Sequence, residues 1–180
     1  MLTRIGWVAA LSLLLGIGLS SQAQAKTFEQ RIAGGIEQTA RDLRFDDGFL
    51  ASVGLLLAKG GPGSAQFSVI IEGGPLVANT DCPVGSIVQQ PVVAGGFVTT
   101  FKDLSLLSGA RGRGVACLDL VTGNISVVVA GDITGGNGRF EGATGSWQVT
   151  AEGEPSWFPA GFPLNTIGYR VTGTVVYDLD

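Results

Sequence analysis

Three carboxylates interrupt stretches of this sequence that otherwise have the pattern of apolar strands: Glu72, Asp119 and Asp132. A buried carboxylate has a raised pKa and can then act as a general acid or base. The same residues also suit strand ends, in water or paired with Arg113 or Arg170. Both interpretations stay open, so the three carboxylates are candidate catalytic residues without a recognised partner.

Histidine is absent from the sequence. A Ser-His-Asp set is therefore excluded, and a cysteine nucleophile would lack its usual base. Two cysteines without histidine cannot by themselves form the usual tetrahedral zinc site. Asp132, Asn137 and Glu141 offer oxygen ligands for calcium, but their spacing does not match an EF-hand loop. We predict no metal site.

Two aromatic residues, Trp147 and Tyr169, are candidates for lining a ligand pocket, although core packing is the stronger interpretation of each. The two cysteines of the sequence, Cys82 and Cys117, are predicted to form a disulfide, because an even cysteine count in an exported protein favours one. Two buried thiols are the alternative.

Residues 1–25 have the features of a secretory signal peptide: Arg4, an apolar run over 7–19, and small residues at Ala23 and Ala25. The apolar run of about 13 residues is shorter than the ~20 that a membrane-spanning helix needs. No later stretch is long and apolar enough to be a transmembrane anchor. We therefore expect an exported, soluble protein, secreted or periplasmic, that starts near Lys26.

The charge balance argues against nucleic acid as a partner. Removal of Arg4 with the signal peptide leaves 10 basic side chains, out of 11, against 15 acidic ones, a net charge of −5. An acidic protein gains nothing from the neutralisation of phosphates, which drives most nucleic-acid binding.

From Phe49 onward the hydrophobic pattern has a period of two and is broken by glycine, proline or asparagine. About eight strands are predicted, over 49–58, 66–72, 84–90, 97–104, 113–121, 124–133, 146–151 and 167–179. Repeated short strands with no helical pattern between them indicate a single all-β domain over 49–180, folded as an antiparallel sandwich or barrel.

Residues 26–48 precede this domain as a separate N-terminal segment. Apolar residues recur there at helical spacing, and Thr27 with Gln30 fits a capping box. The apolar residues are Phe28, Ile32, Ile36, Ala40 and Leu43. Gly34 and Gly35 each weaken a helix by about 1 kcal/mol relative to alanine. The segment is expected to be a loosely docked helix over 27–44 or an irregular stretch.

The predicted strand over 124–133 is apolar on both faces, with Ile125, Val127 and Val129 on one side and Val128 and Ala130 on the other. Such a strand is covered on its outside as well. A segment of the same chain and another subunit explain this cover equally well, so a homo-oligomer stays open.

A glycine-rich segment over 131–147 separates two predicted strands. Its glycines permit positive φ angles and close backbone approach, which a barrel corner or a β-bulge requires. One helical turn would set Phe140 and Ala143 against the core, with Arg139 and Glu141 outward. The Lys-Ser/Thr pair of a phosphate-binding loop is missing. The residues assigned to this structural motif are Gly135, Gly136, Gly138, Phe140, Gly142, Ala143 and Gly145.

Residues 135–145, GGNGRFEGATG, resemble the G-G-(T/S)-G-x-F-x-x-A-x-G segment of the allene oxide cyclase and dirigent-like barrel families, especially secreted bacterial relatives. The similarity spans about 125–180, with Asn137 in place of the more frequent Thr or Ser. The resemblance implies an eight-stranded antiparallel barrel that holds an apolar small molecule and needs no metal or organic cofactor. In those families polar groups inside the barrel guide cyclisation or radical coupling, and no local motif here matches those groups.

The sequence therefore predicts an exported β-barrel that binds an apolar small molecule or has a structural role in the envelope. The alternative is a cofactor-free isomerase, cyclase or coupling-guide enzyme that acts on a hydrophobic substrate.

Overall fold

Nine strands and one short 3-10 helix make up the regular structure of the computed structural model, which describes residues 26–39, 50–78, 82, 88–156 and 166–180. The strands are β1 Lys26–Thr39, β2 Leu50–Lys59, β3 Ala65–Gly73, β4 Val77–Ala78, β5 Val88–Phe101, β6 Leu106–Leu118, β7 Ile125–Gly136, β8 Gly145–Pro155 and β9 Thr166–Leu179. The predicted signal peptide lies outside the described residues, as does the start of the predicted strand over 84–90.

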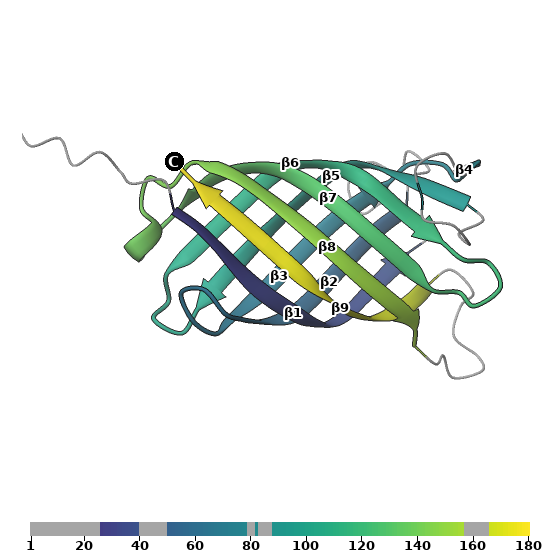
Figure 1. Cartoon of the computed structure of the whole chain (residues 1–180), viewed down its shortest axis with the longest axis horizontal. Coiled ribbons are helices and arrows are strands. Elements are labelled where there is room, and N and C mark those ends of the chain that lie inside the picture. The colour runs from purple at the N-terminus through teal and green to yellow at the C-terminus, as the bar shows by residue number, and fades with distance from the viewer. Residues whose placement is uncertain (1–25, 40–49, 79–81, 83–87, 157–165) are drawn as a thin grey trace, which may run out of the picture.

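The strands form one antiparallel sheet in the order β3-β2-β1-β9-β8-β7-β6-β5-β4, and a further pairing of β3 with β5 closes it. The result is an eight-stranded barrel, in which the two-residue β4 continues the line of β3 along β5. The strands run obliquely around the barrel, and β1 lies beside β9 (Figure 1). The prediction of an all-β antiparallel barrel is confirmed.

The structure differs from the sequence-based expectation over the N-terminal segment. Residues 26–39 are not helical but form strand β1, which pairs with both β2 and β9. Phe28 and Ile32 point into the barrel and are buried, and Gln30 between them is buried too. The helix predicted over 27–44 is therefore wrong up to Thr39, and its last residues lie outside the described part of the chain.

One half of the barrel interior is filled with aromatic side chains. The largest of them are Phe28, Phe67, Phe97, Phe101, Phe140, Trp147 and Tyr177, all buried. Phe97 stacks on Phe67 with the ring centroids 5.3 Å apart and meets the ring of Trp147 edge-on at 5.1 Å. Aromatic pairs of this geometry stabilise a fold by more than the burial of their apolar surface alone. We call this half of the barrel the closed half; the start of β1 and the end of β9 lie side by side at this end of the barrel (Figure 1).

The glycine-rich segment covers this closed end. Its 3-10 helix, Gly138–Phe140, places the Phe140 ring 4.9 Å from that of Phe101, and Ala143 packs against the same core. The guanidinium of Arg139 lies 4.4 Å from the Phe101 ring centroid and 3.5 Å from the Asp103 carboxylate. Phe140 is buried and Ala143 is partly buried against the core, and the segment connects β7 to β8.

The predicted disulfide is also present. Cys82 and Cys117 are joined, with their Cα atoms 5.7 Å apart. Cys117 belongs to β6 and lies beside Ala116 and Leu118, which point into the half of the barrel opposite the aromatic cluster. The disulfide thus ties the connection between β4 and β5 to the wall of the less filled half.

Candidate functional site

The half of the barrel opposite the aromatic cluster holds a cavity of about 170 Å³. We call it the mouth cavity. Residues of seven strands line it, and most of the side chains are apolar, among them Ile36, Ile71, Val92, Leu118, Ile125 and Val127. A smaller void of about 30 Å³ shares Ile36, Ile71, Ile125 and Val127 and reaches down to Trp147. The interior therefore changes along the barrel axis from solid aromatic packing to open apolar space.

Small side chains leave this space unfilled. The mouth cavity is lined by the small residues Ser52 on β2, Gly73 on β3 and Ala116 on β6. In the closed half, inward positions of the same three strands hold the larger residues Leu56, Phe67 and Leu107. Gly73 has a further role, because a Cβ atom there would lie 2.6 Å from the amide of Gln90. The missing side chain makes the slot in which the Gln90 amide sits.

Four polar side chains reach the mouth cavity: Gln38, Ser52, Gln90 and Tyr169. The Gln38 amide nitrogen donates a hydrogen bond of 3.0 Å to the Gln90 amide oxygen. The Gln90 nitrogen in turn donates to the Gly74 carbonyl at 3.2 Å. Register places Gln38 directly opposite Ser52. A few fixed polar groups in an apolar cavity are typical of a small-molecule site.

Tyr169 is the titratable residue of this site. It lies opposite Ile36 across the β1–β9 pair, and only 5% of it is exposed. Burial raises the pKa of its hydroxyl above the ordinary value. No described residue hydrogen-bonds to that hydroxyl. Tyr169 is thus protonated at neutral pH and has a free donor in an apolar cavity.

The three candidate carboxylates do not meet, and none of them lines the mouth cavity. Glu72 lies between the inward residues Ile71 and Gly73 on β3, so it points to the outside of the barrel. Asp132 is on the outer face of β7, 3.4 Å from Arg111, where both side chains are exposed.

Asp119 builds the turn between β6 and β7. Its carboxylate accepts hydrogen bonds from the backbone nitrogens of Val121 at 2.8 Å and Thr122 at 3.3 Å. These bonds lower the pKa of Asp119. A carboxylate held ionised in a turn has a structural role.

The two aromatic candidates for lining a pocket lie in different parts of the barrel interior. Trp147 is 2% exposed and donates from its indole nitrogen to the Asp132 carbonyl at 3.1 Å, so it is a core residue that forms the floor of the smaller void. Tyr169 lines the mouth cavity and also the larger, open hollow on the outer wall. Gln38, Ser52 and Gln90 were not predicted. Gln38 would have been found by continuing the two-residue period of Phe28 and Ile32.

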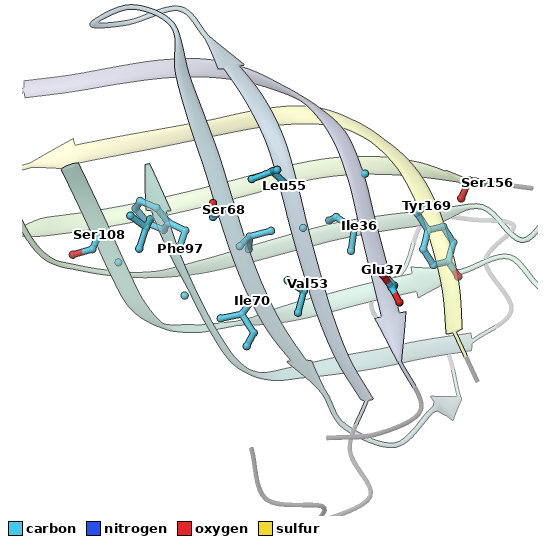
Figure 2. A pocket seen from close by; sticks show the side chains of 16 residues that line it. Ile36, Glu37, Val53, Leu55, Ser68, Ile70, Phe97, Ser108, Ser156 and Tyr169 are labelled. Atoms are coloured by element: carbon cyan, nitrogen blue, oxygen red, sulfur yellow. The ribbon is translucent and has the colours of Figure 1, made fainter. Parts of the chain in front are cut away.

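A second, open hollow of about 860 Å³ lies on the outer wall of β1, β2, β3, β5 and β6 (Figure 2). Val53, Leu55, Ile70 and Val98 stand around it with exposed fractions of 43%, 58%, 42% and 42%. In register they alternate with small residues such as Gly35, Ser68 and Gly96. Val128 on β7 is also 40% exposed, so the described chain does not cover the outer face of the two-faced strand. The homo-oligomer stays a prediction.

Within the described ranges no three metal-ligating side chains come together. No helix among the described residues is long and apolar enough to cross a membrane. No family model, curated protein or solved structure matches the chain.

Proposed function

We propose that this protein binds a small, mainly apolar molecule in the mouth cavity. The observation that carries the proposal is the contrast within one barrel. Aromatic rings pack against one another in one half, whereas small and aliphatic side chains leave about 170 Å³ open in the other. An apolar cavity of about 150 Å³ stays dry and holds a molecule such as benzene. The mouth cavity therefore suits a ligand with a single ring or a short branched chain.

Filling the cavity tests this function. Ala116 points into the mouth cavity, whereas Ala130 on β7 is exposed on the outer face. Ala116→Phe should abolish binding of isopropylbenzene in isothermal titration calorimetry, because the new ring occupies the ligand's space. Ala130→Phe is the matched control and should leave the affinity unchanged. Equal binding by both variants would refute the site.

The isomerase or cyclase alternative needs a group in the cavity that transfers a proton. Glu72, Asp119 and Asp132 lie elsewhere, which leaves the Tyr169 hydroxyl among the described lining residues. Because burial raises the pKa of this hydroxyl, it donates a hydrogen bond at neutral pH but does not act as a base. The geometry thus supports binding better than proton-transfer catalysis. Turnover by Tyr169→Phe equal to that of the wild type, with any substrate, would exclude Tyr169 as the catalytic group.

We also propose that the protein is exported and that it is related to the allene oxide cyclase and dirigent-like barrels. The Cys82–Cys117 disulfide supports export, because disulfides persist in oxidising compartments. The eight-stranded barrel and its glycine-rich corner support the relationship. A mature protein whose mass begins at Lys26 would establish cleavage. A structural role in the envelope is the conclusion if no apolar probe binds.

A further inference from the structure

The two tyrosines of the sequence offer a comparison within the same strand. Tyr169 and Tyr177 both point into the barrel from β9. At the closed end, the Tyr177 hydroxyl lies 2.9 Å from that of Thr99, and both residues are fully buried. The Tyr169 hydroxyl, at the mouth, has no hydrogen-bond partner among the described residues. Because Tyr169 lines the mouth cavity, this hydroxyl can donate a hydrogen bond to a ligand group there, which adds to the free energy of binding.

The rest of the wall defines what that group is. The amides of Gln38 and Gln90 bond to each other and to the Gly74 carbonyl, so the nitrogen of Gln90 is already engaged. No residue that lines the mouth cavity in the described part of the chain carries a charge. Glu152 borders the smaller void, but it is exposed on β8. An ionised ligand would leave water without finding an opposite charge here, at a cost of several kcal/mol.

We infer that the ligand of the mouth cavity is an uncharged molecule with a hydrogen-bond acceptor, such as a ketone, aldehyde or ether, which accepts from the Tyr169 hydroxyl. This inference rests on the proposed function and narrows it to a ligand class. Tyr169 then selects ligands that carry a hydrogen-bond acceptor, while the aliphatic side chains of the cavity wall limit the size of the ligand.

Three near-isosteric probes separate the contributions: isopropylbenzene, acetophenone and benzoate. In calorimetry with the full chain, acetophenone should bind about fivefold more tightly than isopropylbenzene, since a net hydrogen bond is worth roughly 1 kcal/mol. Benzoate should show no binding. Tyr169→Phe keeps the ring and should reduce the affinity for acetophenone to that for isopropylbenzene, which itself should not change.

Tyr177→Phe is the matched control, because it removes a hydroxyl from the same strand outside the cavity and should leave the ratio of the two affinities unaltered. Far-ultraviolet circular dichroism of each variant checks the fold. Isopropylbenzene binding with no preference for acetophenone, an equal loss of both in Tyr169→Phe, or tighter binding of benzoate would overturn the inference and leave the proposed function intact. Absence of binding by all three probes would overturn the proposed function, and the inference with it.

Discussion

The hydroxyl of Tyr177 lies 2.9 Å from the hydroxyl of Thr99, across the interior of the closed half of the barrel. The two residues come from β9 and β5, which are not neighbours in the sheet, and both are fully buried. This hydrogen bond therefore spans the interior between strands that no ladder connects.

Loss of either hydroxyl should destabilise the barrel. Tyr177→Phe and Thr99→Val should each lower the free energy of unfolding by about 1–3 kcal/mol, because each leaves a buried hydroxyl without a partner. The double variant should cost less than the sum, with a coupling of about 1 kcal/mol. Urea denaturation of the four proteins measures this coupling. Strictly additive losses would show that the two hydroxyls do not interact.

The same tyrosine makes stability depend on alkaline pH. Burial raises the pKa of Tyr177 well above its ordinary value of 10.0, and burial raises that of Tyr169 too. The stability contribution is complete below pH 10, where both states are protonated. Above it the unfolded chain binds fewer protons than the folded one, so the free energy of unfolding falls by up to about 1.4 kcal/mol per pH unit and tyrosine.

Urea midpoints measured from neutral pH to strongly alkaline pH check this dependence. Since the sequence has two tyrosines, phenolate absorbance reports these two residues alone. Tyr177→Phe should flatten the alkaline decline relative to the wild type. If stability falls equally in the wild type and in Tyr177→Phe at alkaline pH, the lysines and not Tyr177 cause the fall.

The disulfide should be a large contributor to stability. It closes a loop with a sequence separation of 35 residues. Restriction of the unfolded chain by a loop of this length is worth about 3–4 kcal/mol. Cys82→Ser/Cys117→Ser should lower the urea midpoint accordingly, and alkylation with and without reductant should show the two-hydrogen mass difference in the wild type. A midpoint equal to that of the wild type would contradict this prediction.

Two glycines of the barrel corner offer a matched pair of substitutions. Gly145 has φ +131°, and a Cβ atom there would collide with the Asp178 carbonyl oxygen on β9. Gly142 has φ +75° with open space around it. Gly142→Ala should cost about 1–2 kcal/mol, the strain of the left-handed region alone. Gly145→Ala should cost clearly more, because backbone must also move. Equal midpoints for the two variants in thermal unfolding would refute the packing argument.

The strands predicted over 49–58, 66–72, 124–133, 146–151 and 167–179 each correspond to one observed strand, because their alternation is clear. The two strands predicted over 84–90 and 97–104 are wrong as separate elements, since the structure has a single strand there, β5 Val88–Phe101, whose glycines at 95 and 96 pair with β3 instead of forming a turn. In β8, Trp147, Val149 and Ala151 are buried, and the polar residues between them are exposed. The corner was predictable as well, since Phe140 and Ala143 stand alone as apolar residues among glycines.

Strand β1 was not predictable in the same way. Phe28, Ile32 and Ile36 are spaced by four residues, and this spacing suits both one face of a helix and one face of a strand. On the strand, the inward positions between them hold Gln30 and Gly34, which hide the period of two. Tyr169 was a candidate for the site, but the meeting of Gln38 with Gln90 depends on pairing across the barrel, and no local pattern encodes it.

The pairing of β1 with β9 has a consequence for how the protein acquires its shape. Lys26 lies opposite Leu179, and Thr39 lies opposite Thr166, so the closing ladder joins the most distant described parts of the chain. Every other ladder forms between strands that follow one another closely. Folding should thus proceed as an open meander that stays incomplete until β9 has been synthesised, and pairing of β1 with β9 should limit the folding rate.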